Sequence, residues 1–137
     1  MPSLDNMMLR QIIMDHYENP RNHELVEDDS YKKVNMDSET CIDNIDIQAK
    51  IENGVIEDIR FDGEACAICT SSTSIMTELL IGKTIDEARV IIENYMNMIF
   101  EKDYDPEILE EAIAFYNTHK QANRIKCATL GWKGITQ

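Results

Sequence analysis

The sequence predicts an α+β fold in which helices pack a small antiparallel three-stranded sheet. Three observations predict it. Apolar residues alternate with polar ones on both sides of Asn53-Gly54, the apolar spacing is helical before and after that region, and no repeat or linker-like stretch interrupts the chain. We therefore expect the 137 residues to form one domain, residues 1–137, which is long enough to bury a hydrophobic core.

The sheet is predicted from a hairpin over residues 45–61. Apolar residues alternate with polar ones from Ile45 to Ile51, and Val55, Ile59 and Phe61 continue the core face of a second strand. Asn53-Gly54 favours a type I′ turn, because both central residues of that turn take a positive φ. A third strand is predicted around residues 31–36, after a polar loop over residues 21–30.

Helices are predicted on both sides of this sheet. A first helix over residues 4–17 ends at Asn19-Pro20, because the residue before a proline disfavours the helical region. Four more are predicted: from Cys66 to Gly82, from a capping box at Thr84 to about Met98, from Asp105-Pro106 to about Tyr116, and after Cys127.

The composition limits the classes of partner. The formal net charge is −13, so the surface repels phosphate backbones and anionic lipid, and we expect neither nucleic acid nor a membrane as a partner. A protein partner with a basic docking face fits better, although the acidity can also serve solubility alone. No apolar run is long enough to span a membrane, and the start of the chain shows no secretion signal. We therefore expect a cytoplasmic protein with reduced cysteines.

The candidate site consists of Cys41, Asp43, Cys66 and Cys127, each of which lies in a polar stretch. Three thiolates and a carboxylate suit tetrahedral zinc or an iron–sulfur unit. Cys41 and Asp43 precede one strand of the hairpin and Cys66 follows the other, so the hairpin can bring them to one end of the sheet. The alternative is that the cysteines are small buried core residues.

Other residues near this site have open roles. Cys69 forms a Cys-x-x-Cys pair with Cys66 and is either a metal or redox residue or a small residue in the first helical turn. Arg124 lies close to Cys127 and either stabilises anionic thiolates there, which we treat as a catalytic role, or is simply solvated. The three histidines, none beside a cysteine, are metal ligands by type only: His16, His23 and His119.

Four segments carry a resemblance to a known family. They are IIMDHYENPRN (Ile12–Asn22), ETCIDNI (Glu39–Ile45), FDGEACAIC (Phe61–Cys69) and RIKCATLGW (Arg124–Trp132). Together they resemble the SufU-type proteins, the zinc-binding branch of the IscU/NifU-N family of iron–sulfur cluster assembly. IscU proteins carry a Leu-Pro-Pro-Val-Lys motif and a histidine before the last cysteine, whereas this chain lacks the motif and has Lys126 there. Residues 101–121 look like the extra segment of SufU proteins.

The resemblance implies that Cys41, Asp43, Cys66 and Cys127 bind zinc and that Cys41 accepts sulfur as a persulfide. The sulfur would come from a PLP-dependent, SufS-like cysteine desulfurase, with a histidine of that partner replacing Cys41 at the zinc, and would go on to downstream iron–sulfur assembly proteins. Two alternatives remain: an IscU-like scaffold that assembles and transfers a [2Fe–2S] cluster, and a structural zinc-bound interaction module.

The sequence departs from the family pattern at three positions. Ile42 and Ala65 replace glycines of the first and second ligand motifs, and Cys69 stands where serine or alanine is common. A β-branched residue is strained at a positive φ, so we expect the turn at Ile42 to differ from the family's turn.

Overall fold

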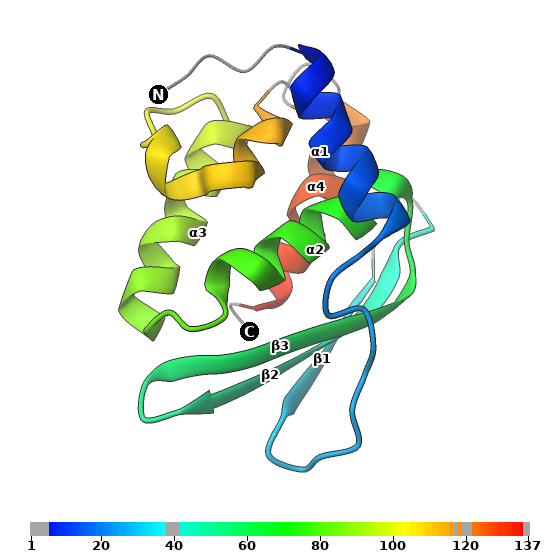
Figure 1. Cartoon of the computed structure of the whole chain (residues 1–137), viewed down its shortest axis with the longest axis vertical. Helices are drawn as coiled ribbons and strands as arrows, with labels where there is room; N and C mark the ends of the chain where they lie inside the picture. The colour runs from blue at the N-terminus through cyan, green and yellow to red at the C-terminus, as the bar shows by residue number, and fades with distance from the viewer. Residues whose placement is uncertain (1–5, 38–41, 117, 119–121, 136–137) are drawn as a thin grey trace.

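The computed structural model describes residues 6–37, 42–116, 118 and 122–135, and it confirms the predicted α+β fold. The helices gather on one side of a three-stranded antiparallel sheet (Figure 1). The described elements are α1 (Asn6–Glu18), β1 (Lys32–Asp37), β2 (Asn44–Glu52), β3 (Val55–Glu64), α2 (Ala67–Leu80), α3 (Ile85–Ile99), the 3₁₀ helix η1 (Pro106–Phe115) and α4 (Ala122–Gly134). None of the described helices is both long and apolar enough to cross a membrane.

The sheet forms as the hairpin pattern predicts. β2 and β3 pair antiparallel, and the turn residues Asn53 and Gly54 take φ values of 54° and 76°, as a type I′ turn requires. The predicted third strand is confirmed as β1, which pairs with β2 to give the order β1-β2-β3. The open end of the hairpin therefore consists of the residues just before β2 and just after β3.

One detail of the hairpin prediction is wrong. The alternation placed Ile51 and Val55 on the core face, but Ile51 is 47% exposed and Ile56 is the buried residue instead. The register shifts between Lys50 and Ile51, where a bulge inserts an extra residue. Because side chains alternate with a period of two, a one-residue shift reverses which residues face the core.

The predicted helices are confirmed, with two corrections. The capping box is present at the start of α3, where the Thr84 Oγ1 accepts from the Glu87 N–H at 3.1 Å. The segment after Asp105 is a 3₁₀ helix rather than an α-helix, and it is kinked at Glu110, whose φ is 46°. The last helix begins at Ala122, so Cys127 lies inside it and not ahead of it.

α2 is the central helix and contacts α1, α4, η1 and β3. Its buried middle is a run of small hydroxyl residues, 70–74, which lets neighbouring helices approach closely. A Cβ added to Gly131 of α4 would lie 2.3 Å from the Thr73 Oγ1 of α2. The two helices thus meet at a glycine, and this close contact fixes the distance between the segments that carry Cys66 and Cys127.

Buried polar contacts hold α4 in place next to Cys127. The carbonyl of Ala128 accepts from the Ser72 Oγ at 2.6 Å and from the Tyr95 hydroxyl at 2.7 Å. The Trp132 Nε1 donates to the Ser72 Oγ at 3.0 Å, and the rings of Trp132 and Tyr95 stack with centroids 3.8 Å apart. Burial raises the pKa of Tyr95, so its hydroxyl stays protonated and remains a donor.

Gly63, near the end of β3, is required by a close approach of two strands. Its φ is 134°, and a Cβ there would lie 2.3 Å from the Asn44 carbonyl oxygen of β2. We expect Gly63→Ala to destabilise the fold by about 2 to 4 kcal/mol in urea unfolding, because both the φ and the contact disfavour a side chain. Gly54→Ala is the control: it also has a positive φ but no atom within 4 Å, so about 1 kcal/mol is expected. Equal losses would contradict the steric argument.

Candidate metal centre

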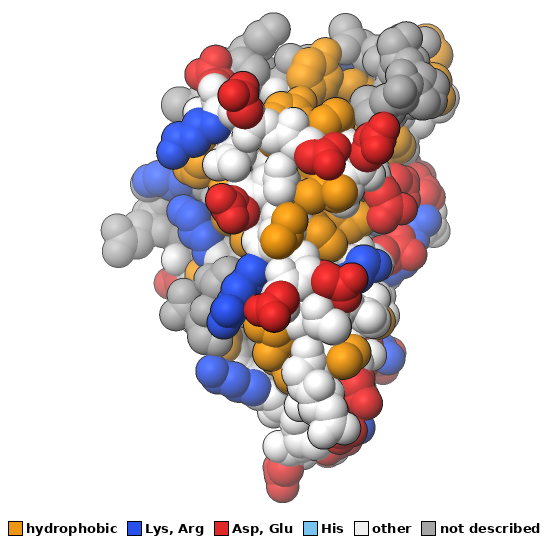
Figure 2. Space-filling model, turned by 90° about the vertical axis from the view of Figure 1, so that its left-hand side faces the viewer, with side chains coloured by type: hydrophobic (Ala, Val, Ile, Leu, Met, Phe, Trp, Pro, Cys, Tyr) orange, Lys and Arg blue, Asp and Glu red, His pale blue; other side chains and the backbone are white. Residues whose placement is uncertain are grey.

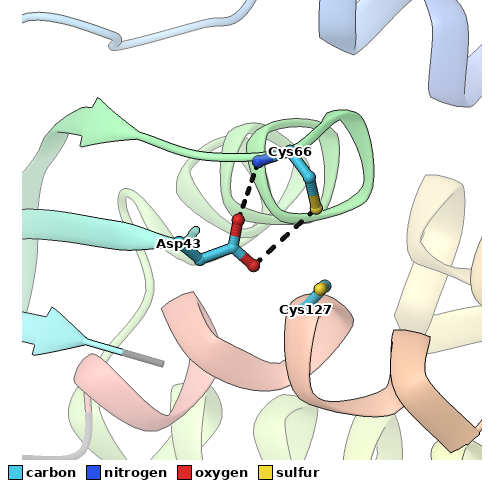
Figure 3. Close-up of side chains that lie close together, drawn as sticks. All are labelled: Asp43, Cys66 and Cys127. Atoms are coloured by element: carbon cyan, nitrogen blue, oxygen red, sulfur yellow. Dashed lines mark hydrogen bonds between the residues drawn. The ribbon is translucent and has the colours of Figure 1, made fainter. Parts of the chain in front are cut away.

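Three of the four predicted ligands come together at one end of the sheet (Figure 3). Asp43, Cys66 and Cys127 each offer a ligand atom, and these atoms all lie within 4.8 Å of one another. Asp43 directly precedes β2, Cys66 directly precedes α2, and Cys127 lies in α4. The cluster therefore depends on the hairpin and on the packing of α4 against α2.

The hairpin register brings Asp43 and Cys66 together. Asn44 pairs with Glu64, so the chain before β2 and the chain after β3 emerge side by side. Asp43 is fully buried, and its Oδ1 accepts from the Cys66 N–H at 2.7 Å. The Cys66 thiol lies 3.7 Å from the Asp43 Oδ2, to which it donates. These contacts aim the carboxylate and the sulfur at the same point, as Figure 3 shows.

Cys66 is the N-cap residue of α2. Its backbone is extended, with φ −71° and ψ 171°, and its Sγ accepts from the Cys69 N–H at 3.4 Å. Cys66 therefore presents its sulfur at the N-terminal end of α2, beside the backbone N–H groups of the first helical turn. The side chain is half-buried, so the site is not sealed from solvent.

Cys127 enters the site from the first half of α4, where it is buried. The prediction that the last helix follows Cys127 is wrong, because the helix starts five residues earlier. The neighbouring Ala128 is fixed by Ser72 and Tyr95, so the position of this thiol is set by the buried contacts of α4.

The donor set fits a metal ion. Two thiol groups and a carboxylate are donor types that bind zinc, and the spread of 4.8 Å lets small side-chain movements bring all three to one ion. Iron is bound by the same donors. We therefore treat Asp43, Cys66 and Cys127 as a potential metal site.

The other predicted residues lie as follows. Cys41 falls outside the described residues, while Ile42 beside it is 69% exposed. Arg124 is exposed on α4, about one helical turn before Cys127, and its catalytic role stays a prediction. Cys69 is fully buried in α2 and does not belong to the cluster formed by the described residues. Ala65 does not take a positive φ, so replacing the family's glycine causes no strain there.

None of the described histidines approaches this cluster closely enough to join it. His23 packs on Phe61, with ring centroids 4.8 Å apart, and its Nε2 lies 3.3 Å from the Asp62 Oδ1. His16 is buried beside Glu78 and Glu111 at another place in the fold. His119 lies outside the described residues.

The geometry can be compared with known proteins. A model of the NifU-like N-terminal domain matches residues 8–136. The chain belongs to the NifU-like N-terminal domain family. The predicted family membership is therefore confirmed. Within the family, this chain is similar to the zinc-dependent sulfurtransferase SufU of Bacillus subtilis, with 40% identity over 93% of this chain and 86% of that protein.

The chain is also similar to proteins of this family that are named as scaffolds rather than as sulfurtransferases. The chain is 32% identical to the iron–sulfur cluster assembly scaffold protein IscU of Streptococcus pyogenes, over 96% of this chain and 82% of that one. Among solved structures it resembles SufU of Fervidobacterium islandicum, with a TM-score of 0.84, 31% identity and 92% of each chain covered. A NifU-like protein of Brucella abortus, 22% identical over 91% of this chain and 87% of its own, shares the fold with a TM-score of 0.78.

Proposed function

We propose that this protein is a zinc-dependent sulfurtransferase of iron–sulfur cluster assembly, which accepts sulfur on Cys41 from a cysteine desulfurase. The observation that supports this most is the cluster of Asp43, Cys66 and Cys127, of which Asp43 lies two residues along the chain from Cys41. The similarity to a SufU protein named as a zinc-dependent sulfurtransferase supports the same activity.

The transfer step is an exchange between sulfur atoms. The Cys41 thiolate attacks the outer sulfur of a persulfide on the desulfurase cysteine, and a new S–S bond forms on Cys41. The original S–S bond breaks, and the desulfurase cysteine leaves as a thiolate. No external oxidant or reductant is needed, because the sulfane sulfur keeps its oxidation state.

In this proposal Cys41, Asp43, Cys66 and Cys127 hold the zinc. Bound zinc would keep the cysteine sulfurs deprotonated, which is the form that reacts. The protein supplies the rest: the hairpin aligns Asp43 with Cys66, and α4 holds Cys127. Arg124, exposed on the same helix, would stabilise anionic sulfur during transfer.

A second candidate is a scaffold that assembles a [2Fe–2S] cluster on the same residues. The similarity to IscU of Streptococcus pyogenes favours it, and so does the preference of iron for the same donors. Lys126 stands where IscU proteins have histidine, and this removes one potential cluster ligand. A structural zinc module without turnover is the third possibility.

The deciding experiment measures metal content and desulfurase activity together. For the sulfurtransferase we expect about one zinc per chain after aerobic purification, and a large rise in cysteine turnover when the protein is added to a SufS-like desulfurase. Cys66→Ser should lose both the zinc and the rise in turnover. Iron with acid-labile sulfide, and no rise in turnover, would instead indicate the scaffold. A rise that Cys41→Ser retains in full would indicate the structural module.

A further inference from the structure

A second group of metal-ligating side chains lies away from the thiol cluster. His16 of α1, Glu78 of α2 and Glu111 of η1 each offer a ligand atom, and these atoms lie within 4.8 Å of one another. The His16 Nε2 is 3.5 Å from the Glu111 Oε1 and 3.7 Å from the Glu78 Oε1. Three separate helices thus direct one imidazole nitrogen and two carboxylates to one place.

The imidazole is held in a fixed orientation. His16 is fully buried, and its Nδ1 lies 2.7 Å from the Ser74 Oγ, which also accepts from the backbone N–H of Arg21 at 2.8 Å. A hydroxyl can donate to or accept from Nδ1, so this contact is kept in either tautomer. Metal-binding histidines are commonly held by such a hydrogen bond at the second ring nitrogen, which leaves Nε2 for the ion.

The two carboxylates border a cleft of about 210 Å³, lined by Ile75, Glu78, Leu79, Glu110 and Glu111. The side chains of Glu78 and Glu111 are 46% and 51% exposed, so an ion can enter from solvent and the carboxylates can adjust to it. The kink at Glu110, with φ 46° and ψ −123°, places two consecutive glutamates at the cleft.

The electrostatic setting favours a cation. The chain has a net charge of −13, and Figure 2 shows acidic side chains spread over the face in view, with Lys and Arg on both sides of it. Among the described residues, Arg21 faces this cluster, with its Nε 3.5 Å from the Glu78 Oε1. That guanidinium also pairs with Asp15 at 2.7 Å, so its charge is shared between two carboxylates.

We propose that His16, Glu78 and Glu111 form a second divalent-metal site, separate from the thiol centre. One imidazole and two carboxylates suit ions such as Mn²⁺ or Fe²⁺, and the absence of thiols from the set disfavours Cu⁺. Three ligands from one side leave the remaining positions to water in the cleft. The competing interpretation is that the three residues only form ion pairs that fix α1 against α2 and η1.

Manganese binding distinguishes the two interpretations. Mn²⁺ is titrated into protein that already carries one equivalent of zinc, and free Mn²⁺ is followed by electron paramagnetic resonance. We expect one Mn²⁺ per chain, and we expect Glu78→Gln and Glu111→Gln each to weaken binding by about 10-fold or more. Glu110→Gln is the matched control: it removes one charge from the same cleft but no ligand, so a change of only about 2-fold is expected.

Two outcomes would overturn the proposal. One is a wild-type protein that takes up no Mn²⁺; the other is equal weakening in the Glu110 and Glu111 variants, which would indicate a diffuse acidic surface. A second readout is the nuclear magnetic resonance signal of the His16 ring, which bound Mn²⁺ should broaden beyond detection. If that signal stays sharp while Mn²⁺ binds, the ion is elsewhere and the proposal is wrong. Thermal unfolding of each metal-free variant verifies that the fold is intact.

Discussion

Replacing Cys41 by alanine is expected to reduce sulfur transfer from a cysteine desulfurase to the background rate. The reason is that the attacking thiolate is lost and no other described thiol can take its place. Cys69 is fully buried and Cys127 is only 6% exposed. The Cys66 sulfur is the N-cap of α2, where it accepts from the Cys69 N–H. The measurement is the amount of labelled sulfur carried by the protein after incubation with the desulfurase and labelled cysteine, followed by purification without reductant.

The matched control for this variant is Cys69→Ala. It removes a thiol three residues from Cys66, yet that thiol lies in the core and does not belong to the Asp43–Cys66–Cys127 cluster. Transfer by the Cys69 variant should therefore stay close to the wild-type rate. If Cys69→Ala lost transfer while Cys41→Ala retained it, the assignment of the acceptor would be wrong and Cys69 would be the sulfur carrier.

Replacing Trp132 by alanine is expected to cost about 3 to 5 kcal/mol of unfolding free energy, among the largest losses for one core side chain. The ring is fully buried and stacked on Tyr95, and its Nε1 donates to Ser72. Its removal leaves a cavity between α4 and α2 and takes a donor from the network that fixes Ala128. Urea unfolding of the metal-free protein measures the loss.

The same change should also weaken zinc binding, because Cys127 precedes Ala128 in α4 and loses its fixed position. Tyr95→Phe separates the two contributions: it keeps the stacked ring and removes only the hydroxyl, with its bond to the Ala128 carbonyl and its 3.1 Å contact with the Ser72 Oγ, so about 1 kcal/mol is expected. A Trp132 variant as stable as the wild type would show that α4 is held by other contacts.

The sequence predicts this fold well where local chemistry decides it. Asn53-Gly54 and the alternating strands predict the hairpin, and Thr84 with Glu87 predicts the start of α3. The bulge near Ile51 is not predictable from alternation, because it depends on how β3 meets the core. For the same reason the pattern assigned Val55 rather than Ile56 to the core.

In the candidate site, too, some features follow from local sequence and others depend on tertiary packing. The hairpin alone predicts that Asp43 and Cys66 meet, but the place of Cys127 depends on Gly131 and on the buried contacts of α4, which no local pattern reveals. The group of His16, Glu78 and Glu111 was not predictable, because it needs the packing of three helices. His16 was singled out by residue type only, and neither glutamate carries a local signal.

The length of α2 sets the distance between the thiol cluster and the group of His16, Glu78 and Glu111. Cys66 caps its first turn and Glu78 lies near its last, so with a rise of about 1.5 Å per residue the two groups are roughly 18 Å apart along the axis. That separation is about twice the distance over which ions in the cell screen exposed charges. Salt therefore weakens, on the solvent-exposed side of the helix, the field that one end exerts on the other. A displacement of α2 as a whole would have to overcome its close fit against Gly131 of α4.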